Sequence, residues 1–144
     1  MNPVAPHLLA SAVVLDAGGT RVLLARTGQY RRWNLVGGHV SGGEPLVEAA
    51  RREVRDTGGL SRFRVVEPHL AVQQDLVDCG QGEARHVDHI FAVVADVHEP
   101  TGGFEVDDDP GEAEVGWFAV SALPQPLAPG VGLHLRSALR TAFG

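Results

Sequence analysis

One stretch of the sequence combines glycines, carboxylates and an arginine at fixed spacings. Its key positions are Gly38, Glu44, Arg52, Glu53 and Gly59. On a helix, Glu53, Asp56 and Thr57 stand at positions i, i+3 and i+4, so their side chains project from one stripe. Mg²⁺ prefers several hard oxygen ligands, and this stripe offers them together with a backbone carbonyl of Gly37 or Gly38. The spacing therefore predicts a Mg²⁺ site of the kind that cleaves pyrophosphates.

A helix over residues 44–57 is expected to position this stripe. Ser41 stands three residues before Glu44 and could form a capping box, while Pro45 suits a first helical turn. The pair Gly58-Gly59 can end the helix in a left-handed conformation. One arc of the helix is apolar, and its members are Leu46, Val47, Ala50 and Val54.

The alternative is an ordinary amphipathic surface helix. In that interpretation the ion pairs Glu48–Arg52 and Arg52–Asp56, each at i and i+4, would account for the charges. They would not account for the spacing between the glycines and the glutamates. With ordinary residue frequencies, the five key positions coincide by chance roughly once in 10⁴ chains of this length. A functional origin of the pattern is therefore favoured.

The stretch resembles the Nudix box. The family pattern is a Gly, five residues, a Glu, seven residues, Arg-Glu, an aliphatic residue, any residue, Glu-Glu, any residue, Gly and an aliphatic residue. The residues that match it in register are Gly38, Glu44, Arg52, Glu53, Val54, Gly59 and Leu60. Asp56-Thr57 replaces the paired glutamates, so one carboxylate is missing. The convincing similarity covers about residues 33–60.

The resemblance implies a fold and an activity. The fold would be α/β, a Nudix-type α/β/α sandwich with a mixed β-sheet, formed by a single domain over residues 1–144. The activity would be Mg²⁺-dependent hydrolysis of a nucleoside diphosphate linked to another group, with Mn²⁺ able to replace Mg²⁺. The partner would be a nucleotide-type small molecule. The family also allows a homodimer, for which the sequence indicates no interface.

The resemblance also assigns roles to the box residues. Glu53 would be the principal metal ligand or base and Asp56 a shortened ligand, while Arg52 and Glu44 would orient the helix carboxylates. Thr57 stands where a second glutamate is usual. Because a hydroxyl replaces a carboxylate poorly around a hard dication, we expect weaker metal binding, a slower reaction or both. The same departure motivates a second hypothesis, a non-catalytic Nudix-fold module that binds a nucleotide or a partner protein.

Composition narrows the classes of partner. The net charge is −6 and no basic stripe dominates, which argues against binding to a nucleic-acid duplex. All 12 basic residues are arginine, which excludes Schiff-base chemistry and a P-loop. The single Cys79 excludes an internal disulfide and fits a reducing compartment. The apolar run at 4–15 follows no basic residue and does not fit a signal peptide or membrane span. A cytoplasmic protein without membrane association is expected.

The rest of the chain is expected to form strands around the box helix, followed by one closing helix. Runs with strand character are 8–15, 21–26, 63–77, 87–97 and 115–120, and an amphipathic helix is expected at 133–143. Asp16-Ala17-Gly18-Gly19 should join the first two runs as a hairpin. The run 87–97 is apolar on both faces, which predicts a central strand.

Several other polar residues are candidates for metal or phosphate binding. His86 and His89 are three residues apart on a predicted strand, so they should point to opposite faces and not share an ion. The acidic segment 107–114 could supply a ligand or a base, although such loops are usually only solvated.

Arginines and aromatic residues flank the box on its N-terminal side. Arg26, Arg31 and Arg32 could clamp a phosphate, with surface ion pairs as the simpler explanation. Trp33 is expected in the core, although it could instead stack on a base together with Tyr30. The glycines at 37, 38, 42 and 43 should allow positive φ or close approach of the backbone to a metal or phosphate.

Overall fold

The computed structural model describes residues 6–27, 31–78, 82–98, 100 and 113–144. Its elements in chain order are β1 (His7–Leu15), β2 (Arg21–Thr27), β3 (Val36–His39), α1 (Leu46–Asp56), β4 (Phe63–Asp78), β5 (Glu83–Ala95), β6 (Ala113–Ala119) and α2 (Val131–Phe143). Each expected strand and helix is present, and the short strand β3 is an addition that the sequence did not predict. Three features named from the sequence lie outside the described residues: Tyr30, Cys79 and residues 107–112 of the acidic segment 107–114.

The strands form one mixed sheet. Within the described residues it has six strands in the order β4-β5-β1-β2-β6, and β3 also pairs with β1. β1 and β5 are parallel, whereas the other pairs are antiparallel. One edge of β1 carries two partners, because it pairs with β2 at Val14 and Leu15 and with β3 over residues 9–12. β5 lies inside the sheet, as the apolar run 87–97 predicted.

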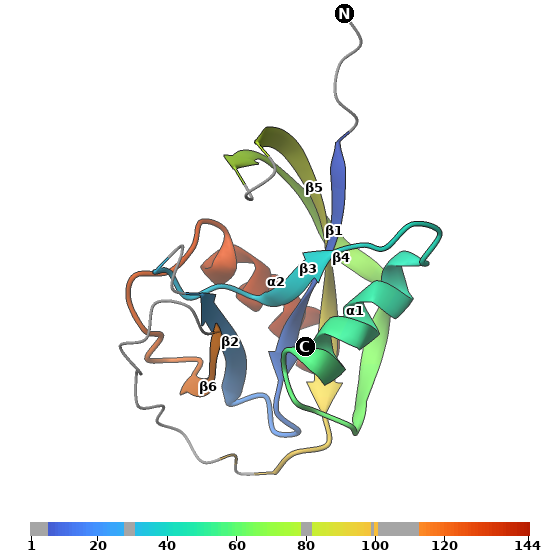
Figure 1. Cartoon of the computed structure of the whole chain (residues 1–144). Coiled ribbons are helices and arrows are strands. Elements are labelled where there is room, and N and C mark those ends of the chain that lie inside the picture. The colour runs from blue at the N-terminus through green and yellow to red at the C-terminus, as the bar shows by residue number, and fades with distance from the viewer. Residues whose placement is uncertain (1–5, 28–30, 79–81, 99, 101–112) are drawn as a thin grey trace, which may run out of the picture.

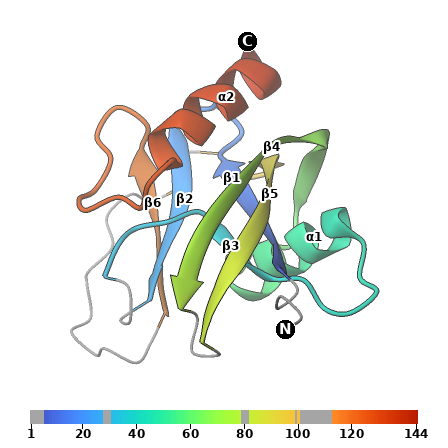
Figure 2. The ribbon, with the colours of Figure 1, turned by 90° about the horizontal axis from the view of Figure 1, so that it is seen from above.

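The two helices cover opposite faces of the sheet (Figure 1). The view from above shows the strands passing between α2 and α1 (Figure 2). Successive residues of β1 point to opposite faces, so Val13 packs in the core cluster that includes Leu135 of α2, while Val14 packs with Val54 of α1. The predicted α/β/α sandwich is confirmed. In the described part of the chain, neither helix combines the length and apolar character that a membrane crossing demands.

Helix α1 is shorter at both ends than the sequence predicted. Pro45 is its N-cap, with φ −61° and ψ 144°. The capping box is half formed, because the Ser41 amide donates to Glu44 Oε1 at 3.1 Å but no side chain caps the first turn. Gly59 has a φ of +71° and its amide donates to the Arg55 carbonyl at 3.1 Å. The helix therefore ends in the predicted left-handed turn.

The apolar arc of α1 faces the sheet, as the periodicity predicted, and one carboxylate is buried beside it. Ala50 and Val54 are fully buried against the sheet, and Glu48 and Arg55 are exposed. Glu53 is also buried, with 9% of its surface exposed. A carboxylate so placed needs charged or hydrogen-bonding partners to offset its loss of water. Those partners define the candidate site.

Candidate active site

Arg52 connects the two glutamates that the box places near the helix. Its Nε and Nη2 donate to Glu44 Oε2 and Oε1 at 3.0 and 3.1 Å, in a bidentate pair. Nη1 donates to Glu53 Oε1 at 2.8 Å, and Nη2 also donates to the carbonyl of His39 at 3.0 Å. A guanidinium presents its donors in a rigid planar fork. Arg52 can therefore hold helix α1, the loop before it and the end of β3 in one arrangement.

The charges in this network reinforce one another. Hydrogen bonds from the Arg52 side chain and then from the Ser41 amide lower the pKa of Glu44. The bond to Glu44, and after it the bond to Glu53, raises the pKa of Arg52. Glu44 and Arg52 are consequently charged throughout the neutral pH range.

Glu53 is packed between a glycine and a threonine. Its Oε2 accepts a hydrogen bond from Thr57 Oγ1 at 3.0 Å, so the predicted stripe brings these two side chains together. A Cβ atom at Gly38 would lie 2.6 Å from Glu53 Oε1. Gly38 is thus required for close approach inside an extended strand, not for positive φ. Gly43, by contrast, has a φ of +77° in the loop before the helix.

Two expectations about the helix surface have different outcomes. Asp56 is exposed and makes no hydrogen bond or ion pair with the residues that the structure describes, so it lies on the stripe without joining the network. The alternative pairs Glu48–Arg52 and Arg52–Asp56 are wrong, because Arg52 turns toward the carboxylates described above. Glu48 instead contacts Arg51 Nε at 3.3 Å.

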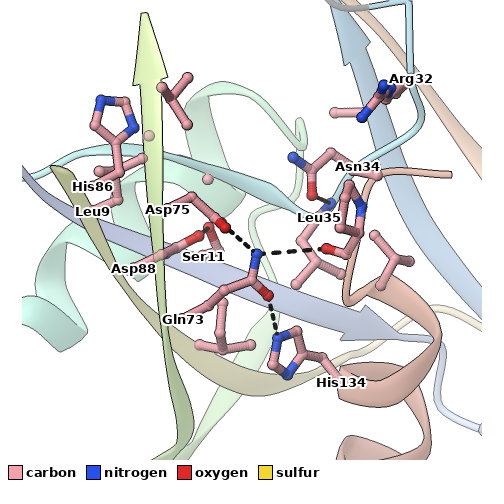
Figure 3. Close-up of a pocket in the computed structure, with 18 of the residues that line it drawn as sticks. Leu9, Ser11, Arg32, Asn34, Leu35, Gln73, Asp75, His86, Asp88 and His134 are labelled. Carbon is pink, nitrogen blue, oxygen red and sulfur yellow. Dashed lines mark hydrogen bonds between the residues drawn. The ribbon is translucent and has the colours of Figure 1, made fainter. Parts of the chain in front are cut away.

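A cavity of about 610 Å³ lies beside the box (Figure 3). Gly37, Gly38 and Thr57 contribute to its wall, so the cavity and the box are contiguous. Its further polar lining residues include Arg32 and Asn34 before β3 and seven residues from four strands and from α2, namely Ser11, His39, Gln73, Asp75, His86, Asp88 and His134. Of the seven residues on the strands and α2, the sequence indicated only His86, as a possible metal ligand beside His89.

Gln73 ties α2 to the sheet at this cavity. Its Nε2 donates to Asp75 Oδ2 at 2.8 Å, and its Oε1 lies 2.8 Å from His134 Nε2 (Figure 3). An amide oxygen can only accept, so we assign the hydrogen of His134 to Nε2. Burial lowers the pKa of His134. The imidazole is therefore neutral at pH 7.

Asp88 is a perturbed acid in the cavity wall. Burial raises its pKa to about 6, although the Ser11 hydroxyl donates to its Oδ2 at 2.8 Å and acts in the opposite direction. Perturbed carboxylates in cavities are frequent in functional sites. The sequence could have placed Asp88 and His86 on one face of β5, because residues two apart on a strand share a face. It could not have shown that Ser11 is the partner of Asp88, because that contact depends on the register between β5 and β1.

The arginines before the box have different surroundings. Arg26 Nε and Nη2 donate to Glu114 Oε2 at 3.0 and 2.6 Å, and the guanidinium lies 4.8 Å from the centre of the Trp33 ring. Trp33 is 3% exposed, so its expected place in the core is confirmed. Arg31 and Arg32 are exposed, and Arg32 lines the cavity. Of the three arginines, Arg32 is the one that lines the cavity.

A family model described as the NUDIX domain matches residues 5–137. The chain belongs to the Nudix family. The match extends well beyond the box at 38–60 and includes the cavity-lining strands and most of α2. The Nudix resemblance that the box alone indicated is thus confirmed over most of the chain.

Solved Nudix structures share this fold. A NUDIX family hydrolase from Clostridium perfringens has a TM-score of 0.73 at 15% identity, covering 95% of this chain and 98% of its own. A MutT NUDIX hydrolase from Burkholderia pseudomallei has a TM-score of 0.61 at 25% identity, with coverages of 93% and 98%. The NUDIX domain of Shewanella oneidensis NrtR, complexed with ADP ribose, has a TM-score of 0.62 at 16% identity, with coverages of 95% and 88%. A search of curated proteins found no match.

The buried His134 predicts a pH dependence of stability in this Nudix domain. Because burial lowers its folded-state pKa below the unfolded value of about 6.5, the unfolded chain binds the proton first as the pH falls. The stabilisation is present above pH 6.5 and is lost as the pH drops below it. The variant His134→Gln has no imidazole to protonate at this position. Lowering the pH from 7.5 to 5.5 should therefore decrease the free energy of unfolding of wild type relative to that of the variant. Urea denaturation at both pH values checks this, and a constant difference would contradict it.

Proposed function

We propose that this chain is a Mg²⁺-dependent Nudix pyrophosphohydrolase that cleaves a nucleoside diphosphate linked to another group. Family membership supports its coarser part, a hydrolase acting on phosphoric anhydride bonds. The observation that carries the proposal is the position of the Glu53 carboxylate. It is buried against the backbone of Gly38 and held by Arg52 and Thr57, beside a cavity of about 610 Å³.

The oxygen atoms around Glu53 suit a hard dication. Each Glu53 oxygen accepts one hydrogen bond from the described residues and keeps a further lone pair for a metal. Asp56 is exposed and has no competing partner in the described part of the chain. The Thr57 hydroxyl and a carbonyl of Gly37 or Gly38 complete a set of hard ligands that Mg²⁺ or Mn²⁺ prefers.

Each residue of the network has a distinct role in the proposed reaction. When bound, Mg²⁺ would offset the charge of the pyrophosphate and polarise its oxygens. Glu53 binds the ion or accepts a proton from the attacking water. Arg52 fixes the orientation of Glu53, and Glu44 in turn fixes Arg52 through its bidentate bond. Thr57 supplies a weaker ligand than a carboxylate would, which predicts lower metal affinity or a slower rate.

The cavity supports a nucleotide-type substrate. Its volume lies within the range of about 300–1,000 Å³ that is usual for small-molecule sites. The ADP ribose bound by the NUDIX domain of NrtR is itself a nucleoside diphosphate linked to another group. Arg32 on the cavity wall is placed to contact a phosphate. Homodimerisation and a cytoplasmic location stay predictions from the sequence.

A non-catalytic binding module is the second candidate. It is favoured by the Thr57 hydroxyl, which donates to Glu53 where the family pattern would have a second glutamate. Such a module would bind a nucleotide in the cavity without turning it over. The two candidates are separated by measuring binding and product release on the same compounds.

The first prediction from the proposed function concerns substrate turnover. A panel of nucleoside diphosphate derivatives, incubated with Mg²⁺ or Mn²⁺, should contain at least one that releases a nucleoside monophosphate, as followed by anion-exchange chromatography. Chelation by EDTA should abolish the release, because metal supplies the charge neutralisation. Turnover that persists in EDTA would exclude the metal mechanism, and binding without turnover would favour the binding module.

The second prediction concerns Glu53. Glu53→Gln keeps the side-chain shape and removes the charge, so it should reduce the rate by at least the roughly 10²-fold that a positioned acid-base group contributes. Glu48→Gln is the matched control, because Glu48 is exposed on the same helix and its contact with Arg51 is at the surface. The control should retain the wild-type rate. A wild-type rate in Glu53→Gln would place the base and ligands elsewhere.

The third prediction uses the departure at Thr57. Thr57→Glu should add a carboxylate next to Glu53 and so tighten Mg²⁺ binding, raise the rate, or both. Thr57→Gln has the same length without the charge and should show neither gain. Calorimetric titration with Mg²⁺, beside the rate assay, measures both effects. No change in Thr57→Glu, or an equal change in Thr57→Gln, would remove Thr57 from the metal shell.

A further inference from the structure

Three histidines from three neighbouring strands meet at one end of the sheet. His7 at the start of β1 pairs with His86 in the parallel β1–β5 ladder. His39 at the end of β3 is opposite Leu9 of β1. Because residues 7 and 9 of a strand point to the same face, the three imidazoles form a cross-strand row. Their ring centroids are 5.2 to 5.4 Å apart.

The ring nitrogens are close enough to share an ion. One nitrogen from each of His7, His39 and His86 lies within 4.8 Å of the others. A tetrahedral zinc with bonds of about 2.0–2.1 Å needs nitrogens about 3.3 Å apart. His39 is exposed and His7 is half-buried, and both stand at strand ends, where side chains are held by fewer neighbours than in the core. Small side-chain rotations would therefore bring the three nitrogens to bonding distance.

His86 provides an independent sign of a ligand. It is 7% exposed, and its Nε2 is buried without a hydrogen-bond partner among the described residues. Buried polar atoms in native proteins nearly always have a partner. A bound ion would supply the partner that this buried Nε2 lacks in the described part of the chain.

We propose that His7, His39 and His86 form a binding site for a divalent transition metal, with Zn²⁺ as the expected ion. Three neutral imidazoles with one open position are a known ligand set of zinc sites. Imidazole nitrogens favour Zn²⁺ over Mg²⁺. His39 and His86 both line the cavity, so the fourth position is open to water or to a phosphate oxygen of a bound molecule.

This imidazole site is distinct from the carboxylate site of the box. Gly38 and His39 are consecutive residues of β3 and face opposite sides of the sheet. Gly38 faces Glu53 on the side of α1, whereas the side chain of His39 points to the other side, and both residues line the cavity. The two sites also differ in chemistry, because one offers hard oxygens and the other offers imidazole nitrogens.

His89 is not part of this site, which agrees with the prediction that His86 and His89 point to opposite faces of their strand. The ring of His89 lies 5.3 Å from that of His69, away from the imidazole row. The partners of His86 are residues 7 and 39, which lie 79 and 47 positions away along the chain. No local spacing could have indicated them.

Calorimetric titration of the metal-free full chain with ZnCl₂, without substrate, tests the proposal. Wild type should bind one Zn²⁺ per chain, and His7→Gln and His39→Gln should each weaken binding by at least about 100-fold, since even the loss of an outer-shell partner costs 10- to 100-fold. The matched control is His69→Gln, which removes an exposed histidine that contacts another imidazole, and it should bind as wild type does. Circular dichroism of each metal-free variant verifies folding.

A second measurement separates the imidazole site from the box. Zn²⁺ should raise the melting temperature of wild type and of Glu53→Gln, because both keep the three imidazoles, and should leave that of His39→Gln unchanged. The proposal is overturned if wild type binds no stoichiometric Zn²⁺, if the two imidazole variants bind as tightly as wild type, or if Glu53→Gln loses the ion. Because no substrate is present, these outcomes are independent of whether the chain hydrolyses a nucleotide.

Discussion

The charged fork of Arg52 is the interaction on which the candidate site depends. Its guanidinium holds Glu44 in the loop before α1, Glu53 inside the helix and the carbonyl of His39 at the end of β3. Glu53 is buried, and a buried carboxylate that loses its charged partner is strongly destabilising. The site geometry and the packing of α1 on the sheet are thus coupled through one side chain. A lysine could not replace it, because an ammonium lacks the planar set of donors.

β1 sets the positions of the other functional groups. The edge of β1 that does not pair with β5 pairs with β3 over residues 9–12 and with β2 at Val14 and Leu15. The two glycines of β3 therefore lie beside Ala10 and Ser11 of β1. Alternation then divides consecutive residues between two faces. Gly38 faces Glu53 and the helix, whereas Gly37 faces Ser11 and the cavity. The Glu53 carboxylate and the Ser11 hydroxyl consequently lie on opposite sides of one short strand, and the cavity reaches the box where Gly38 and Thr57 line it.

Long-range polar contacts join the elements that line the cavity. Gln73 of β4 joins His134 of α2, and Ser11 of β1 joins Asp88 of β5. These contacts combine neutral imidazole, amide and hydroxyl groups with the carboxylates of Asp75 and Asp88, so the wall offers both hydrogen-bond donors and acceptors to a polar ligand. In the proposed function, Arg32 on the wall would contact a phosphate, and a metal held by the box carboxylates would offset its charge.

The sequence by itself determined the box helix, its apolar face, its left-handed end at Gly59 and the order of most strands. These features depend on residues a few positions apart, where periodicity and backbone preference act directly. It did not determine β3, because four residues that include two glycines carry no strand pattern. The surface-helix alternative assigned Arg52 to Glu48 and Asp56, because several carboxylates lay within reach along the helix, and only the fold selected Glu44 and Glu53 among them. The row formed by His7, His39 and His86 was decided by the tertiary structure alone, because strand register joins residues whose separation in the chain carries no information about their contact.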